Sequence, residues 1–416
     1  MSTETARAVR IPALKGIAPP ARRNMLLLAA GMAALYGMVE LAAAMATLTF
    51  TSAGGSRALA GLAPAVFLGA AALTALPAGS AMDRFGRAPI LRLGFGLGIG
   101  GSLLAALGAF SAAVALVVLG FVLIGASIGT VMLSRAAAAD MYPAERRAQG
   151  IGLVLFGAVF GALLGPLAFI PLVTSGDLGS SSLGPAWLGA AGFMVVGLAL
   201  MGALRRGPGG MAGTLGPEGP ASAAAAEPIG VIVRRPAIPA ALVAAVASWT
   251  VMVTLMTLSG AALVEHGHGR NAVFPVLSAH FVGMFALFPL VGRVIDRAGR
   301  DRTLVGGLAL LAGSALALAG SLDSVALSAV ALLGVGLGWS FSYVAATAEL
   351  AEGAGPAERG RLLGFADLLS GLCGAAFTVV AGLALARVGV EAICIAGAVV
   401  ATTAALWIAS RGRGSA

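Results

Sequence analysis

The sequence predicts an all-α membrane protein whose twelve transmembrane helices form two six-helix repeats. Of its 416 residues, 59% are hydrophobic and only 10% are charged, whereas a soluble domain carries about 25% charged residues. Apolar runs of about 18 to 26 residues, each able to span roughly 30 Å of hydrocarbon as a helix, recur along the chain. A charged motif in the first half returns in the second half, which indicates a duplicated unit.

Each apolar run is expected to be a helix, because a backbone in hydrocarbon has to satisfy its own hydrogen bonds. Twelve runs meet the length requirement, and charged residues mark the connections between them. In chain order, we expect spans at 25–50, 58–81, 89–110, 112–134, 149–173, 185–204, 237–262, 272–292, 303–320, 325–348, 362–385 and 390–409.

The basic residues indicate which side each loop faces. The net charge of +9 does not come from a clustered recognition surface, so the expected partner is the lipid bilayer and not nucleic acid. Positive charges gather on the cytoplasmic side of membrane proteins, which predicts a multi-pass protein of the bacterial cytoplasmic (inner) membrane with both termini in the cytoplasm. Five basic residues precede the first span and three fall on the opposite side: Arg7, Arg10, Lys15, Arg22 and Arg23, against Arg57, Arg270 and Arg387.

Two motifs repeat at a constant offset of 213 residues. The segment GSAMDRFGRAP after the second span returns as GRVIDRAGRDR after the eighth, and PAER after the fourth span returns after the tenth. Parallel repeats of this kind are typical of secondary transporters that rock one half against the other. We therefore expect a six-helix bundle over 1–204, a flexible cytoplasmic linker over 205–236 and a second six-helix bundle over 237–416.

The repeated loop G-x-x-x-D-R-x-G-R resembles the signature loop of the major facilitator superfamily. The resemblance implies the major facilitator fold, with a central cavity that opens alternately to each side and a cytoplasmic gate that includes charges of this loop. Asp83 is expected to pair with Arg135 at the inner end of the fourth span; the alternative is that these charges only fix topology. The expected gate residues are Asp83, Arg84, Arg87, Arg135, Asp296, Arg297, Arg300 and Asp367.

One carboxylate, Glu40, lies near the middle of the first span. An ionisable group in hydrocarbon is costly and therefore indicates function, so Glu40 is the expected proton or charge partner of a transported ion. The alternative is a protonated glutamate that hydrogen-bonds to a neighbouring helix.

Met and His side chains recur four residues apart on the seventh and eighth spans. Met252 and Met256 form one pair, and His280 and Met284 form the other; a spacing of four puts each pair on one helix face. Met commonly fills gaps in apolar cores, but the chain has only three His, so the second pair is not expected by chance. At 1.5 Å per residue, the four side chains descend from about 6 Å to about 18 Å below the outer surface.

Thioether and imidazole groups suit Cu(I), so these positions predict a metal path whose outer mouth carries His266 and His268. The M-x-x-x-M and H-x-x-x-M pairs also resemble those of the CcoA-type copper importers, the CalT family. That resemblance implies that the four side chains bind copper, that copper is imported for assembly of cytochrome c oxidase, and that a copper chaperone is a partner. Copper is then the transported substrate, and no resident cofactor is expected.

Two other classes of function are compared with copper import by the residues that each would need. A proton-coupled exporter of drugs or small metabolites would use the same Met side chains to line an apolar cavity and Glu40 as its proton site. A membrane enzyme is not expected, because the chain has no paired nucleophile and base and no site for a metal-bound water.

Overall fold

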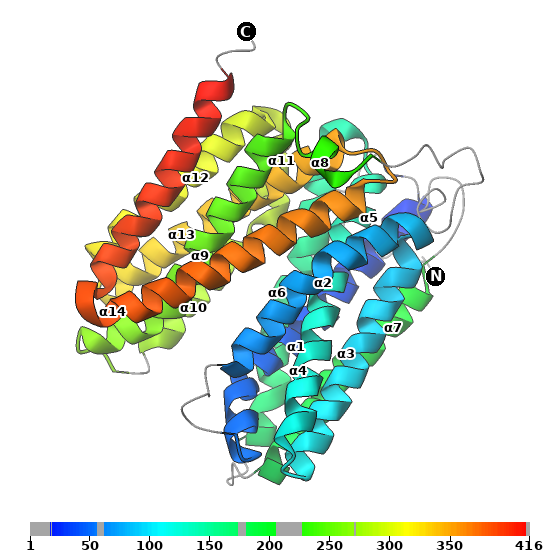
Figure 1. The fold of residues 1–416 in the computed structure, drawn as a ribbon, viewed down its shortest axis with the longest axis vertical. Helices are drawn as coiled ribbons and strands as arrows, with labels where there is room; N and C mark the ends of the chain where they lie inside the picture. Colours follow the sequence, from blue (N-terminus) through cyan, green and yellow to red (C-terminus); the bar gives the residue numbers. More distant parts are fainter. Residues whose placement is uncertain are drawn as a thin grey trace, which may run out of the picture.

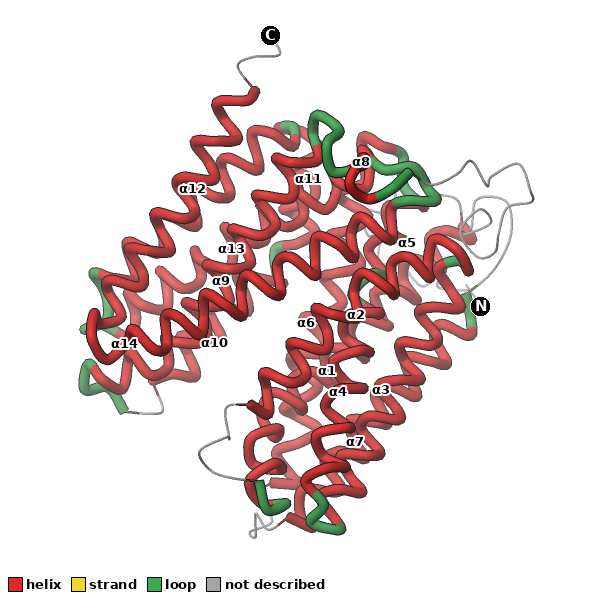
Figure 2. The backbone as a smooth tube through the Cα atoms, in the orientation of Figure 1, coloured by secondary structure: helices red, strands yellow, loops and turns green. Residues whose placement is uncertain are grey.

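The computed structural model describes residues 17, 19–55, 62–173, 180–204, 227–269 and 272–412. All regular structure in these residues is helical (Figure 2). The first half contains α1 (Pro19–Ser52), α2 (Leu62–Phe85), α3 (Arg87–Phe110), α4 (Val114–Val131), α5 (Ser134–Asp140), α6 (Arg147–Val173) and α7 (Ser180–Gly202). The second half contains α8 (Ile229–Ile232), α9 (Ile238–Glu265), α10 (Val273–Phe281), α11 (Phe288–Ala298), α12 (Arg300–Ala319), α13 (Val325–Gly353) and α14 (Arg359–Gly412).

In the described residues, eleven helices are long and apolar enough to cross a membrane, and the bent pair α10–α11 supplies a twelfth span. This number agrees with the sequence prediction. Helix α14 contains two of the spans, 359–385 and 387–411, and turns between them at Gly389, which has φ 76°. Part of the predicted linker, residues 205–226, and five basic residues used to predict topology lie outside the described residues: Arg7, Arg10, Lys15, Arg57 and Arg270.

Figure 1 shows α1–α7 on one side of the molecule and α9–α14 on the other. The two groups meet at the end that carries the α2–α3 and α11–α12 turns, and they diverge toward the opposite end. We call these the gate end and the far end. Helix α1 begins and α14 finishes at the gate end, which corresponds to the side predicted to be cytoplasmic.

Close contacts between helices use glycine. A Cβ atom at Gly157 of α6 would lie 1.9 Å from the carbonyl oxygen of Ala29 in α1. Lipid provides no hydrophobic drive between helices, so small residues that allow close approach hold such bundles together. Glycine also lets the two halves approach closely at the gate end. There, a Cβ at Gly79 of α2 would lie 2.0 Å from the carbonyl oxygen of Gly360 in α14.

The two copies of the charged motif share a backbone conformation. Gly86 separates α2 from α3 with φ 92° and ψ 163°, and Gly299 separates α11 from α12 with φ 88° and ψ 152°. Glycine adopts a positive φ without the steric cost that other residues incur. The glycine of the motif is therefore required by the turn itself, in both halves.

The eighth span is broken, whereas the sequence predicts one helix over 272–292. Helix α10 ends at Phe281, a π-helical turn covers Val282–Ala286, and α11 begins at Phe288. The two parts are bent by 49°. Pro289, in the first turn of α11, has no N–H for the hydrogen bond that a continuous helix needs. Because π-helical turns often mark functional sites, the residues just before the break are candidates for a functional site.

Candidate functional site

Asp83, near the end of α2, connects the first half to the second. Its carboxylate accepts hydrogen bonds from the backbone N–H groups of Gly360 at 2.8 Å and Arg361 at 2.7 Å. These groups belong to the first turn of α14, where unpaired N–H groups and the helix dipole favour an anion. Asp83 also pairs with Arg87 at 2.5 Å. The predicted pairing with Arg135 is absent, because Asp83 instead caps a helix of the other half.

The second repeat makes equivalent contacts in the opposite direction. Asp296 in α11 accepts hydrogen bonds from the backbone N–H groups of Ala148 at 3.3 Å and Gln149 at 3.1 Å, at the start of α6. Arg300 donates to the carbonyl oxygen of Ala144 at 2.7 Å and pairs with Glu349 at 3.4 Å. Each half therefore supplies one carboxylate to the first turn of a helix in the other half.

Arg87 extends the contact between the halves. Besides Asp83, its guanidinium pairs with Asp140 at 3.0 Å and donates to the carbonyl oxygen of Pro356 at 2.8 Å. Arg359, from the second half, pairs with the same Asp140. All four charged side chains are buried. Removing one member of a buried ion pair leaves an uncompensated charge, so this network stabilises the closed gate end.

Two predicted gate residues point away from this network. Arg84 is exposed, and its guanidinium lies 5.1 Å from the ring centroid of Phe85. Arg297 is exposed, and it has no ion pair or hydrogen bond with other described residues. Adjacent residues on a helix face different directions, so the arginine that follows the gate carboxylate cannot share its contacts.

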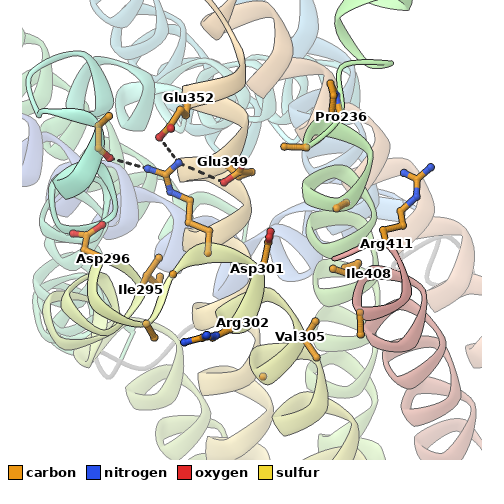
Figure 3. Close-up of a pocket in the computed structure, with 18 of the residues that line it drawn as sticks. Pro236, Ile295, Asp296, Asp301, Arg302, Val305, Glu349, Glu352, Ile408 and Arg411 are labelled. Atoms are coloured by element: carbon orange, nitrogen blue, oxygen red, sulfur yellow. Dashed lines mark hydrogen bonds and ion pairs between the residues drawn. The ribbon is translucent and has the colours of Figure 1, made fainter. Parts of the chain in front are cut away.

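Figure 3 shows a pocket of about 1210 Å³ at the gate end of the second half. It lies between the first turns of α9 and α12 and the last turns of α11, α13 and α14, and Ala144 and Glu145 of the first half also line it. Arg300 lies between Glu349 and Glu352 on one side, while Asp301 and Arg411 occupy other parts of the lining. None of the four predicted metal ligands lines this pocket, so the pocket is separate from the predicted metal path.

Replacing Asp83 with Asn should favour the state that is open at the gate end. The neutral amide loses two charge-assisted hydrogen bonds to α14, and such bonds contribute about 1.5–3 kcal/mol each. A cysteine introduced at the buried Ala75 of α2 should react several-fold faster with a maleimide applied from the gate end. The background for this measurement lacks Cys373 and Cys394.

The matched control for this prediction is Asp301→Asn, which neutralises an exposed carboxylate at the same end and should not change the reactivity. An exchange of Asp83 and Arg135 should not restore the wild-type reactivity, because the two side chains are not partners. Restoration by the exchange would contradict the geometry.

Arg135, in α5, pairs with Asp367 in α14. One guanidinium nitrogen lies 2.6 Å from both carboxylate oxygens, and the guanidinium carbon lies 5.3 Å from the ring centroid of Tyr343. The Arg135 side chain is only 1% exposed. This ion pair thus connects the two halves. It lies within membrane-spanning helices and not in the gate loops.

His280, in α10, is completely buried against α13. Its Nδ1 lies 2.8 Å from the carbonyl oxygen of Leu332, and this contact places the ring proton on Nδ1. Its Nε2 is buried and has no hydrogen-bond partner in the described residues. A buried polar atom without a partner costs about 1–3 kcal/mol. Nε2 therefore offers an unused lone pair inside the second half.

Met284 lies on the π-helical turn that follows His280. Its backbone carbonyl and that of Gly283 accept hydrogen bonds from the Ser340 hydroxyl at 2.6 and 3.0 Å, so a side chain of α13 supports the irregular turn. A Cβ at Gly336 would lie 2.9 Å from the Met284 nitrogen, and glycine there lets α13 approach closely. The Met284 side chain is itself buried.

The Met pair on α9 lies at a similar height along α13 to the pair on α10. Trp249 packs against Trp339 with ring centroids 6.0 Å apart. Met252 lies one helical turn beyond Trp249, toward the far end. Gly336 lies one turn beyond Trp339 in the same direction, and it contacts the α10 pair. Met252 is buried and Met256 is half-buried. The four predicted ligands therefore lie at similar positions along the length of α13, within the second half.

The two loop histidines contact other parts of the second half. His266 places Nδ1 2.9 Å from the carbonyl oxygen of Ala262 and Nε2 3.1 Å from Glu391. The backbone hydrogen bond and then the carboxylate raise the pKa of His266. His268 Nε2 lies 2.8 Å from the carbonyl oxygen of Leu322. These contacts pack the far-end loops, and the role of the two histidines at the mouth of a metal path stays a prediction.

Glu40 is half-buried on α1 and has no hydrogen-bond or ion-pair partner among the described side chains. The described side chains therefore supply no hydrogen bond from a neighbouring helix to Glu40. Tyr36, one turn closer to the gate end, packs against Phe285 of the other half with ring centroids 5.0 Å apart. Glu40 therefore lies one helical turn from a residue that contacts the other half next to Met284 in the chain.

Several residues of the gate network were not predicted from the sequence. Arg359 belongs to the repeated PAER segment, so the repeat was a usable signal for it. Asp140, Glu349 and Glu352 belong to neither repeated motif. Their contacts depend on how the two halves meet, which a sequence pattern does not specify.

These features define a multi-pass membrane carrier built from two half-units that meet at a charged gate. A family model described as Major Facilitator Superfamily matches residues 25–378 and 274–413. The chain belongs to this superfamily, as the repeated loop predicts, and it is a secondary transporter and not an enzyme.

Two relatives match most of the chain. The riboflavin transporter RfnT of Brucella anthropi is 29% identical over 355 residues, which cover 85% of this chain and 86% of RfnT. The uncharacterized MFS-type transporter YddS of Bacillus subtilis is 29% identical over 356 residues, which cover 83% of this chain and 80% of YddS. Neither relative is described as a copper transporter.

Solved structures share the fold at low sequence identity. The proton:xylose symporter XylE has a TM-score of 0.76 at 14% identity, with 94% of this chain and 95% of that chain covered. The transporter FucP has a TM-score of 0.73 at 15% identity, with 92% and 98% covered. These similarities establish the architecture, but they do not identify the substrate.

Proposed function

We propose that this transporter imports copper across the bacterial inner membrane by alternating access, with the Met and His pairs on α9 and α10 as metal ligands. The observation that carries the proposal is the imidazole of His280. A metal-ligating His commonly donates its other ring N–H to a backbone carbonyl, which fixes the tautomer. His280 has this arrangement, with Nδ1 bonded to Leu332 and a buried Nε2 that lacks a partner in the described residues.

The neighbouring side chains are soft ligands. Met284 follows on the π-helical turn, and Met252 of α9 is buried at a similar height along α13. Thioether and imidazole groups favour Cu(I) over harder cations. In the part of the chain that the structure describes, no three His, Cys, Asp or Glu side chains gather as a metal cluster. Two or three neutral ligands bind an ion weakly enough to release it, which transport requires.

Uptake of radioactive copper tests the proposal. Cells that produce the protein should accumulate copper faster than cells with an empty vector, and excess zinc should not compete. Imported copper would pass to a copper chaperone and serve cuproenzymes, so cytochrome c oxidase activity should fall in a strain that lacks the protein and recover with added copper. Equal copper accumulation in both strains, with the protein present in the membrane, would rule out copper import.

Glu40 is proposed as the charge partner or proton carrier for the transported ion, and Glu40→Gln separates these roles. If the carboxylate balances the charge of the ion, the variant should bind copper several-fold more weakly. If it carries a proton, binding should persist while uptake loses its dependence on external pH. Binding and pH-dependent uptake are compared with those of Glu391→Gln, a control that lies just after the turn of α14 at Gly389. No change in either assay would leave Glu40 without a transport role.

A planar organic substrate is the second candidate, because aromatic rings gather between the halves. Trp339 stacks on Tyr343 with centroids 4.8 Å apart and meets Phe285 at 6.2 Å, while Tyr36 reaches Phe285 from the first half. The relative RfnT is described as a riboflavin transporter. A proton-coupled carrier of such a small metabolite would take up or export labelled riboflavin, and His280→Ala would leave that flux unchanged.

A further inference from the structure

One face of α13 follows the span that carries His280 and Met284. The carbonyl oxygen of Leu332 lies 2.8 Å from His280 Nδ1. A Cβ at Gly336 would lie 2.5 Å from the His280 carbonyl oxygen and 2.9 Å from the Met284 nitrogen. The Ser340 hydroxyl lies 2.6 Å from the Met284 carbonyl oxygen. These three residues of α13 are four apart and therefore share one face of the helix, so a single face contacts both members of the pair.

The π-helical turn frees a backbone carbonyl next to Met284. In a regular α-helix the N–H of Leu287 would donate to the carbonyl of Gly283, four residues earlier. Here it donates to the carbonyl of Phe285, so Gly283 loses that donor. Within a membrane a freed carbonyl needs another partner, which is commonly a Ser or Thr side chain of a neighbouring helix.

Ser340 is placed to be that partner. Its side chain is completely buried, and its hydroxyl lies 3.0 Å from the carbonyl oxygen of Gly283 and 2.6 Å from that of Met284. A hydroxyl has one proton and donates to one acceptor at a time, and the contact with Met284 is the shorter. Without this hydroxyl, a regular helix, in which Leu287 donates to Gly283, becomes more favourable relative to the π-helical turn.

The winding of the turn sets the angle between Met284 and His280. Successive residues of an α-helix are rotated by about 100°, so residues four apart are offset by about 40°. A π-helical turn winds more loosely, because its hydrogen bonds span five residues and not four, and the offset becomes smaller. A change to a regular helix would therefore turn the Met284 side chain relative to His280, whose buried Nε2 has no partner in the described residues.

We propose that Ser340 is a positioning residue of the metal site: its hydroxyl holds the π-helical turn, and the turn directs the Met284 sulfur toward an ion bound by His280. The inference rests on the proposed function, because it takes Cu(I) as the ligand, and it adds a residue that does not touch the ion. Leu332 orients the imidazole and Ser340 orients the thioether, so α13 positions both ligands.

Cu(I) binding by the purified full-length protein tests the inference through a double-mutant cycle. Affinity is measured by competition with a Cu(I) chelator under reducing conditions. Ser340→Ala should bind Cu(I) about tenfold more weakly, as expected for loss of an outer partner of a metal ligand. In a Met284→Leu background the same change should have little further effect, because a positioning residue acts through its ligand. In a Met252→Leu background it should again weaken binding about tenfold.

Three further variants separate positioning from a general effect on the fold. Ser340→Thr retains the hydroxyl and should bind Cu(I) nearly as well as the wild type. Ser328→Ala removes another buried hydroxyl of α13, which donates to the carbonyl oxygen of Ser321 at 2.9 Å, and should not change the affinity. If Ser340→Ala does not fold, Pro289→Ala tests the same point, because it restores the N–H that a regular helix needs and should weaken Cu(I) binding several-fold.

X-ray absorption by the bound copper gives a second measurement. Ser340→Ala should show one fewer sulfur neighbour than the wild type, as Met284→Leu should, and the imidazole nitrogen should remain. Equal losses of affinity from Ser340→Ala in the wild-type and Met284→Leu backgrounds would overturn the positioning role. Unchanged affinity in Ser340→Ala, or in Pro289→Ala where the first variant does not fold, would also overturn it. Wild-type affinity in His280→Ala would instead refute the copper site itself, so the two failures are distinguishable.

Discussion

The variant His280→Ala should take up copper at least about tenfold more slowly than the wild type while remaining in the membrane. Loss of even an outer partner of a metal ligand typically lowers metal affinity by about 10- to 100-fold, so loss of the imidazole should have at least this effect. The buried Nε2 without a partner among the described residues is the atom removed. Initial rates of radioactive copper uptake at low external copper provide the measurement.

Isosteric changes at the Met positions separate ligation from packing. Met252→Leu and Met284→Leu keep nearly the same volume, a change that cores usually tolerate, but they remove the sulfur ligand. Both should slow copper uptake. Met194→Leu, at a fully buried Met of the first half, is the matched control and should not. Wild-type uptake by a well-expressed His280→Ala protein would exclude the proposed copper site.

The variant Gly79→Val should abolish transport of any substrate by preventing closure of the gate end. A Cβ at Gly79 would lie 2.0 Å from the carbonyl oxygen of Gly360 in the other half, and backbone cannot move aside as a flexible side chain can. The two halves would then stay apart at the gate end. Spin labels on cysteines that replace Ser111 and Ala326, both exposed at the far end, should lie closer together than in the wild-type background. Substrate uptake should fall to the background of cells without the protein.

Gly69→Val provides the control on the same helix. A Cβ at Gly69 has no neighbour within 4 Å, so the added side chain should leave transport and the label distances unchanged. Gly292 is the equivalent of Gly79 in the second repeat, and a Cβ there would lie 2.6 Å from the carbonyl oxygen of Ala148. Gly292→Val should therefore act like Gly79→Val. Normal transport by both variants would show that these contacts do not form during the cycle.

Much of the fold could be predicted because the membrane restricts the chain so strongly. Twelve spans and the duplicated charged loop were readable from residue type and spacing, whereas the positive φ of the loop glycine came from the structure. The break in the eighth span was not predicted, although Pro289 was visible, because neighbouring groups such as the Ser340 hydroxyl decide whether a freed carbonyl is satisfied. The free Nε2 of His280 also depends on a contact with Leu332 that spacing does not reveal.

The sequence by itself determined which segments are helices, because hydrocarbon leaves the backbone few alternatives. It also determined the two-fold repeat and the residue types available for a soft-metal site. Only the tertiary structure decided which charges meet. Asp83 caps α14 and Arg135 pairs with Asp367, a residue 232 positions away. The physical reason is that an ion pair depends on the faces two helices turn toward each other, and packing of the whole bundle sets those faces.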